Sequence, residues 1–167
     1  TTKRIMCWAC LSAIACLAAA LPSPAQQAGG VYSAALIAVL QSADASLHDK
    51  ALACKQLAVV GDDSAVPVLA SLLGDEKLSH YARFALEPMP GKAGAALREA
   101  LNTVQGTLKL GIINSIGARR DAEAIPALKE LLASDDLALA DAAASALARI
   151  GTPDSVAILI ESLSSAQ

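Results

Sequence analysis

The cysteines and histidines are the side chains of this sequence that could hold a metal ion or carry redox chemistry. Cys7 and Cys10 have the C-x-x-C spacing of the dithiol sites found in soluble redox proteins. They lie inside an apolar segment and lead into no βαβ pattern, so we do not expect a redox site there. His48 and His80 lie far apart, and neither has the H-E-x-x-H spacing that binds zinc. We expect both histidines on the surface, near helix starts.

Patterns for nucleophilic or acid–base catalysis are also missing from the sequence. Cys54 lies among apolar residues, which indicates a packed thiol rather than a nucleophile. The pairs Asp62-Asp63 and Asp135-Asp136 are more typical of turns and helix caps than of an acid–base pair. The sequence has no Gly-rich phosphate loop and no G-x-S-x-G elbow. We therefore predict a protein that is not an enzyme, with no catalytic, cofactor-binding or metal site.

Residues 1–25 have the pattern of a cleavable export signal. Lys3 and Arg4 precede an apolar run over residues 5–21, and small residues stand at the −3 and −1 positions of a cleavage point after Ala25. The run is shorter than the ~20 residues that a membrane span needs. We expect a mature protein that is periplasmic or secreted and has no membrane span.

A lipoprotein signal is the alternative interpretation of the same segment. Residues 13–16 weakly resemble a lipoprotein box, which would place a lipid anchor on Cys16. Ala13 stands where that box usually has Leu, which favours cleavage after Ala25. Residues 26–30 then form a linker to the domain that follows.

The composition predicts an all-α protein. Hydrophobic residues make up 54% of the chain, yet it has only one Phe, one Trp and two Tyr. The apolar residues are mostly Ala, Leu, Ile and Val, and the strand formers never alternate over a useful length. Loss of Lys3 and Arg4 lowers the 13 basic side chains to 11, against 16 acidic ones. Because nucleic-acid binding depends on neutralising phosphates, we expect no nucleic-acid partner.

A repeat of about 30 residues organises residues 31–167. One series of leucines recurs at intervals of 28, 31 and 31 residues, at Leu69, Leu97, Leu128 and Leu159. A second series falls between them at intervals of 29, 30 and 31 residues, at Leu57, Leu86, Ile116 and Leu147. Two interleaved series with one period indicate two helices per unit, which we call A and B.

Capping residues and helix breakers agree with this arrangement. We expect acidic caps before B helices at Asp75 or Glu76 and at Asp135 or Asp136, and glycines after B helices at Gly61 and Gly151. Pro67 and Pro126 fit the first turn of A helices, whereas Pro88 and Pro90 should cut the second B helix short. The first A helix is predicted at residues 32–40, and the B helices at 51–60, 78–86, 108–116 and 137–150. The units are residues 31–61, 62–90, 91–120 and 121–151, with a half unit at 152–167.

Two stretches carry a family resemblance. The B ending Ala146-Leu147-Ala148-Arg149-Ile150-Gly151 and the A opening Asp121-Ala122-Glu123-Ala124-Ile125-Pro126-Ala127-Leu128 resemble the short bacterial HEAT repeats named after phycobilisome lyases. The resemblance covers about residues 31–167 and implies a right-handed α-solenoid of stacked antiparallel helix pairs, with about 4.5 repeats. That family often places Arg early in helix B to pair with acidic turns. This chain has Lys50, Ser79, Lys109 and Ala140 there, so we expect only a partial ladder of ion pairs.

The resemblance implies that the protein binds another protein through a concave surface of B helices. Candidate contact residues are those expected to be exposed on the B helices: Lys50, Lys55, His80, Arg83, Lys109, Asn114, Asp141 and Ser145. Four of these would form a basic stripe and favour an acidic partner surface: Lys50, Lys55, Arg83 and Lys109.

Two alternative functions remain open at this point. The chain could be an accessory docking segment of a larger exported enzyme, because the last A helix has no B partner to cover Val156, Leu159 and Leu163. It could instead handle a chromophore-bearing protein, because bilin lyases share this repeat type. An export signal argues against that intracellular role.

Overall fold

The computed structural model describes the backbone of residues 24–165 and the side chains of residues 30–164. Most of the predicted export signal, with Cys7, Cys10 and Cys16, therefore lies outside the described residues. The described part is all-helical, and no helix in it is long and apolar enough to cross a membrane. In chain order the elements are α1 (Pro24–Gln41), α2 (Leu47–Val60), α3 (Val66–Ser71), α4 (Ser79–Leu86), α5 (Ala93–Thr103), α6 (Gly106–Arg119), the 3₁₀ turn η1 (Ala122–Ala124), α7 (Ile125–Leu132), α8 (Leu137–Ile150) and α9 (Pro153–Ser165).

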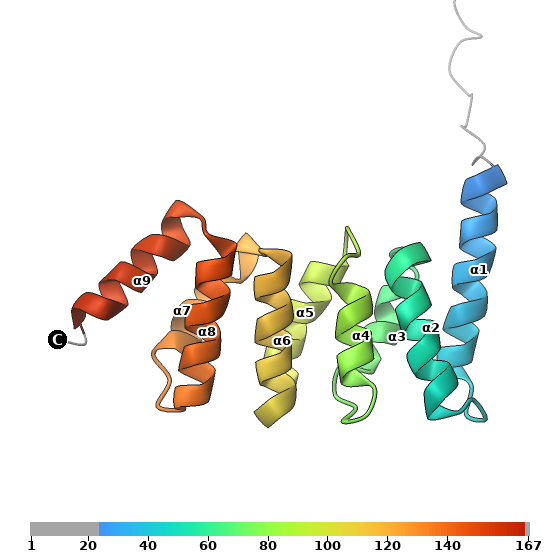
Figure 1. Ribbon diagram of the computed structural model, residues 1–167, viewed down its shortest axis with the longest axis horizontal. Helices are drawn as coiled ribbons and strands as arrows, with labels where there is room; N and C mark the ends of the chain where they lie inside the picture. The colour runs from blue at the N-terminus through green and yellow to red at the C-terminus, as the bar shows by residue number, and fades with distance from the viewer. Residues whose placement is uncertain (1–23, 166–167) are drawn as a thin grey trace, which may run out of the picture.

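The helices form two rows along the long axis of the molecule (Figure 1). The B helices α2, α4, α6 and α8 stand side by side in one row, and each packs on the next. The A helices α3, α5 and α7 lie behind them, with α1 at one end and α9 at the other. This arrangement confirms the predicted solenoid of packed helix pairs.

The helix bounds differ from the prediction mainly at the N-terminal side. Helix α1 begins at Pro24 and so includes residues 26–30, which the sequence assigned to a linker. Helix α2 begins four residues earlier than predicted, because the Ser46 hydroxyl caps it by accepting a hydrogen bond from the Asp49 N–H at 3.1 Å. Helix α4 ends at Leu86, before the two prolines at 88 and 90, as predicted.

The predicted caps of α8 are found, whereas Asp75 accepts from the Lys77 and Leu78 N–H groups in the turn before α4 and does not cap that helix, whose N-cap is Leu78. Asp136 accepts hydrogen bonds from the N–H groups of Ala138 and Leu139 at the start of α8. Gly151 ends α8 with a φ of 66°, a left-handed conformation that favours glycine. Gly61 ends α2 in an extended conformation instead, with a φ of −70°. Glycine is needed there for space, because a Cβ would overlap the Met89 side chain and the Leu57 carbonyl.

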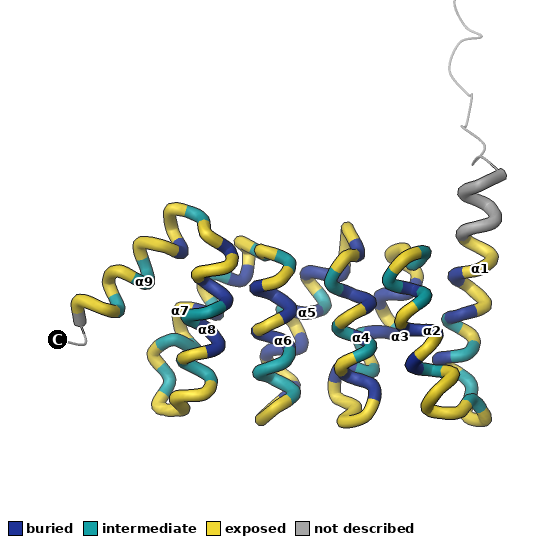
Figure 2. The backbone as a smooth tube through the Cα atoms, viewed as in Figure 1, coloured by how far each residue is buried: buried dark blue, intermediate teal, exposed yellow. Residues whose placement is uncertain are grey.

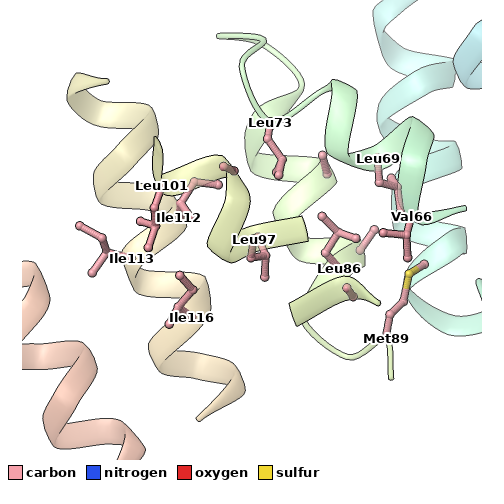
Figure 3. Packing of buried hydrophobic residues seen from close by; sticks show 14 of the residues in the cluster. Val66, Leu69, Leu73, Leu86, Met89, Leu97, Leu101, Ile112, Ile113 and Ile116 are labelled. Carbon is pink, nitrogen blue, oxygen red and sulfur yellow. The ribbon is translucent and has the colours of Figure 1, made fainter. Parts of the chain in front are cut away.

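Both predicted leucine series form the core between the rows (Figure 3). Seven of their eight members are fully buried: Leu57, Leu69, Leu86, Leu97, Ile116, Leu128 and Leu147. The eighth, Leu159 on α9, is only partly buried, because no B helix follows α9 in the described residues. Buried residues lie mostly where the two rows face each other, and exposed ones lie on the outer sides (Figure 2).

Truncation of a series leucine should be far more costly than truncation of an exposed leucine on the same helix. Leu147→Ala removes a side chain with 0% exposure, and we expect the free energy of unfolding to fall by about 2–5 kcal/mol. Leu137→Ala, at a side chain that is 82% exposed, should change it by less than about 0.5 kcal/mol. Urea denaturation followed by circular dichroism measures both variants, and equal losses would contradict the assigned core.

Candidate partner-binding face

The four B helices turn one side away from the A helices, and the leucine series identifies which residues lie on it. A residue two positions before a series residue is rotated by about 200° around the helix axis, so its side chain points away from the core. The residues at this position are Lys55, Phe84, Asn114 and Ser145. The first three are exposed and Ser145 is partly buried. We call this side of α2, α4, α6 and α8 the outward B face.

Five of the eight predicted contact residues lie on or beside the outward B face. Lys55, Asn114 and Ser145 lie at its centre. His80 and Asp141, which are exposed, lie six positions before a series residue, on the flank of the face. The structure thus brings these five side chains to one side of the B row. Whether they contact a partner stays a prediction.

Arg83 is a correction to the predicted face, because its side chain packs against the next unit. Its Nη1 donates hydrogen bonds to the Gly111 carbonyl at 3.1 Å and to the Ser115 hydroxyl at 3.2 Å, and Ser115 donates in turn to Glu87 at 2.7 Å. Burial lowers the pKa of the Arg83 guanidinium, an effect that the Glu87 carboxylate opposes. The guanidinium approaches α6 so closely that a Cβ at Gly111 would lie 2.6 Å from Arg83 Cζ. Arg83 therefore links α4 to α6.

Lys109 is a second predicted contact residue that does not lie on the outward B face. It lines a hollow between α5 and α7, together with Leu101 and Asn102 of α5 and Glu130 of α7. Lys109 lies seven positions before Ile116, and seven residues amount to almost two full helical turns. Its side chain therefore lies on the same side of α6 as the buried series residue. The predicted outward direction rested on a wrong helical phase.

Lys50 has the same position relative to Leu57 that Lys109 has relative to Ile116, and it is partly buried. The predicted basic stripe is therefore not continuous along the outward B face. Of its four members, only Lys55 lies there.

Other arginines join successive units at places that the sequence analysis did not identify. Arg119, at the end of α6, donates from Nη1 to the carbonyls of Leu86, Glu87 and Met89 at 2.6–2.7 Å. These carbonyls are free because Pro88 and Pro90 prevent α4 from continuing. Arg98 on α5 pairs with Asp121 at 2.5 Å and with Glu123 at 2.6 Å. The ion-pair ladder is thus partial, as predicted, but its members differ from those of the resemblance.

Aromatic and apolar side chains make up the part of the outward B face that the prediction missed. Phe84 is 47% exposed on α4, and Leu52 and Val59 on α2 are 45% and 85% exposed. Tyr81, one turn before Phe84, has the His80 ring edge-on at 5.5 Å and the Lys55 Nζ over its ring at 5.5 Å. The sequence already indicates that Phe84 points outward, because Phe84, like Lys55 and Asn114, lies two residues before a member of the second leucine series.

The residues that could bind a metal ion or act as nucleophiles are few in the described part of the chain. No group of three or more His, Cys, Asp or Glu side chains among them could hold a metal ion. Cys54 is fully buried, as predicted, and burial raises the pKa of its thiol to about 11. A thiol that stays protonated at neutral pH is a poor nucleophile. His48 and His80 are exposed on the surface, as predicted.

Residues 94–167 match the family model for HEAT repeats. The match begins in α5 and continues through α9, so it covers the part of the chain with the most regular helix pairs. Residues 94–167 therefore consist of HEAT repeats, and α1 to α4 continue the same helix-pair architecture toward the N-terminus. No curated protein matches the chain in sequence. The phycobilisome-lyase type within the HEAT family stays a prediction.

Loss of Arg83 should destabilise the protein. Arg83→Ala removes two hydrogen bonds between α4 and α6, and we expect the free energy of unfolding to fall by about 1–3 kcal/mol. Lys77→Ala is the matched control, because Lys77 is exposed and its side chain forms no ion pair with other described residues. We expect less than about 0.5 kcal/mol for the control. The measurement is unfolding in urea. An unchanged midpoint for Arg83→Ala would contradict a stabilising link between α4 and α6 and would leave Arg83 as a free surface cation.

Proposed function

We propose that this protein is an exported scaffold that binds another protein through the outward B face, the concave side expected of such a solenoid. The observation that carries the proposal is the exposure of Phe84, Leu52 and Val59 on neighbouring B helices. HEAT repeats in general mediate protein interactions, and the family match therefore supports the same class of function. We infer no catalytic step and no cofactor.

The distribution of side chains supports a binding role. A helix pair cannot bury its apolar side alone, so successive units stack and leave a row of B helices exposed along the whole stack. The buried core consists of aliphatic residues, Ala, Met89 and Cys54, with no aromatic ring among the described core residues. Large apolar side chains on a surface contribute little to folding and much to association. Their position on the outward B face favours a protein partner.

Export is supported by the N-terminal pattern of Lys3, Arg4 and the apolar run that follows. The acidic balance of the remaining chain disfavours nucleic acid as a partner. An extracellular or periplasmic protein target fits both features.

Changing the charges across the outward B face should strongly weaken partner binding without loss of structure. The variant combines Lys55→Glu, Asn114→Arg and Asp141→Arg, all at exposed positions. Affinity capture from the periplasmic or extracellular fraction, with the unchanged chain as bait, identifies the partner. We expect the variant to recover less than about a tenth as much of it, because like charges across an interface cost several kcal/mol.

The control for this experiment is a variant with Glu99→Lys and Glu130→Lys, at exposed positions on the A helices α5 and α7. We expect it to capture the partner as the unchanged chain does, and both variants should keep their helical circular dichroism. Reproducible capture of the same protein by the outward-face variant would place the binding surface elsewhere. Turnover of a small molecule by the pure protein, with no partner recovered, would exclude the scaffold role.

Processing of the N-terminus is a separate expected outcome. We expect the chain, expressed in a Gram-negative host, to be recovered outside the cytoplasm with Gln26 as its first residue. Intact mass and N-terminal sequencing measure this in cell fractions. A chain retained in the cytoplasm with Lys3 and Arg4 would contradict export, and a lipid on Cys16 would replace the predicted cleavage by lipoprotein processing.

A docking role within a larger exported enzyme is a second candidate. It is favoured by α9, an A helix whose apolar residues Val156, Ile160 and Leu163 are 44%, 59% and 71% exposed. These side chains would be buried if another helix packed on α9. Recovery of the enzyme, rather than a separate partner, as the only protein associated with the natural chain would favour this role over the scaffold.

A further inference from the structure

Five side chains on α2 and α4 form a contiguous surface, which we call the α2–α4 patch: Leu52, Lys55, Val59, Tyr81 and Phe84. The α2 members are spaced by three and four residues, so they lie along one side of that helix. Tyr81 and Phe84 are three residues apart and share one side of α4. Helices α2 and α4 pack on each other, and the Lys55–Tyr81 contact joins the two sets of side chains.

Two of the three aromatic residues in the part of the chain whose side chains are described, Tyr81 and Phe84, belong to this patch, and none of the three is fully buried in the core. Phe84 is the only phenylalanine of the sequence and is 47% exposed. Tyr81, one of two tyrosines, is partly exposed, and the other, Tyr32, is 46% exposed. Exposed aromatic side chains typically supply the largest share of binding energy in protein interfaces. The patch therefore has the composition of an interface centre.

The unpaired charges of the patch are positive. Lys55 forms no ion pair with any described residue, and its ammonium lies over the Tyr81 ring. None of the five patch residues carries a carboxylate, and Glu87 at the end of α4 accepts from the Ser115 hydroxyl of α6 at 2.7 Å. Arg83 is partly buried against α6, where it donates to Gly111 and Ser115, and does not compete. A partner group facing Lys55 would best be a carboxylate.

The contact with Tyr81 also favours pairing between Lys55 and a carboxylate of the partner. A lysine side chain normally loses rotamer freedom when it forms an ion pair, which weakens the pair. Contact with the Tyr81 ring already restricts where the ammonium lies, so less freedom remains to be lost on binding. The surrounding Leu52 and Phe84 would exclude water from the pair.

We infer that the α2–α4 patch binds a segment of a partner protein in which apolar side chains stand next to carboxylates. Apolar side chains of the segment contact Leu52, Val59 and Phe84, and a carboxylate pairs with Lys55 beside Tyr81. This inference rests on the proposed binding function and deepens it, because it names the site and the chemistry of the partner.

A library of random short peptides displayed on phage, selected against the full chain, tests this inference. We expect the selected peptides to combine Asp or Glu with large apolar residues. Phe84→Ala should weaken their binding by about tenfold or more, as truncation of an interface centre does. Lys55→Glu should weaken it by about fivefold or more, and added salt should reduce the difference between Lys55→Glu and the unchanged chain.

Matched controls separate the patch from general surface effects. Ile160→Ala truncates an apolar side chain of comparable exposure on α9, and Lys92→Glu reverses an exposed lysine outside the patch. Both should bind the selected peptides as the unchanged chain does. Circular dichroism should be unchanged for all four variants, because each alters an exposed side chain.

The failure of this inference differs from the failure of the proposed function. Peptides that bind Phe84→Ala and Lys55→Glu as tightly as the unchanged chain would overturn the patch and leave the scaffold role standing at another surface. Selected peptides without carboxylates, indifferent to Lys55→Glu, would overturn the partner chemistry. A library that yields no binder, together with no captured protein, would overturn both.

Discussion

Burial of aliphatic side chains between successive helix pairs is the interaction on which the rest of this structure depends. Leu97 and Leu128 have no exposure, although each belongs to a helix of only 8–11 residues that could not be stable alone. Leu163 on α9, on which no later helix packs in the described residues, is 71% exposed. Small and aliphatic residues allow this close packing. Phe84 is not part of it and lies exposed on α4.

Polar contacts between units determine which charges remain for binding. Where Pro88 and Pro90 end α4 early, Arg119 satisfies the free carbonyls, and Arg83 bonds to α6 nearby. These contacts hold the distorted junction between the second and third units, and they remove two arginines from the surface. The outward side of α2 and α4 is left with a single free lysine, Lys55, beside Tyr81 and Phe84. The position of the binding patch thus follows from the way in which the stack is held together.

Periodicity predicted the fold well, because burial in a repeat protein recurs at fixed positions. The leucine series located the helix pairs, and Asp136 and Gly151 marked helix ends through their own local chemistry. The candidate face was predicted less well, since the direction of a side chain depends on helical phase. Lys109 points toward α5 and α7, and Arg83 is engaged by Gly111 and Ser115, more than 25 residues away in sequence. Residue type alone does not reveal Phe84 as a contact residue, because large apolar side chains are usually buried, whereas its position in the series directs it outward.

Hydrogen–deuterium exchange of the full chain, alone and saturated with its captured partner protein, tests the central claim most directly. Our account predicts that binding slows exchange in α2 and α4, since the partner covers Lys55, Tyr81 and Phe84, and leaves α5 and α7 unchanged. Slower exchange confined to the A helices, with α2 and α4 unaffected, would contradict it.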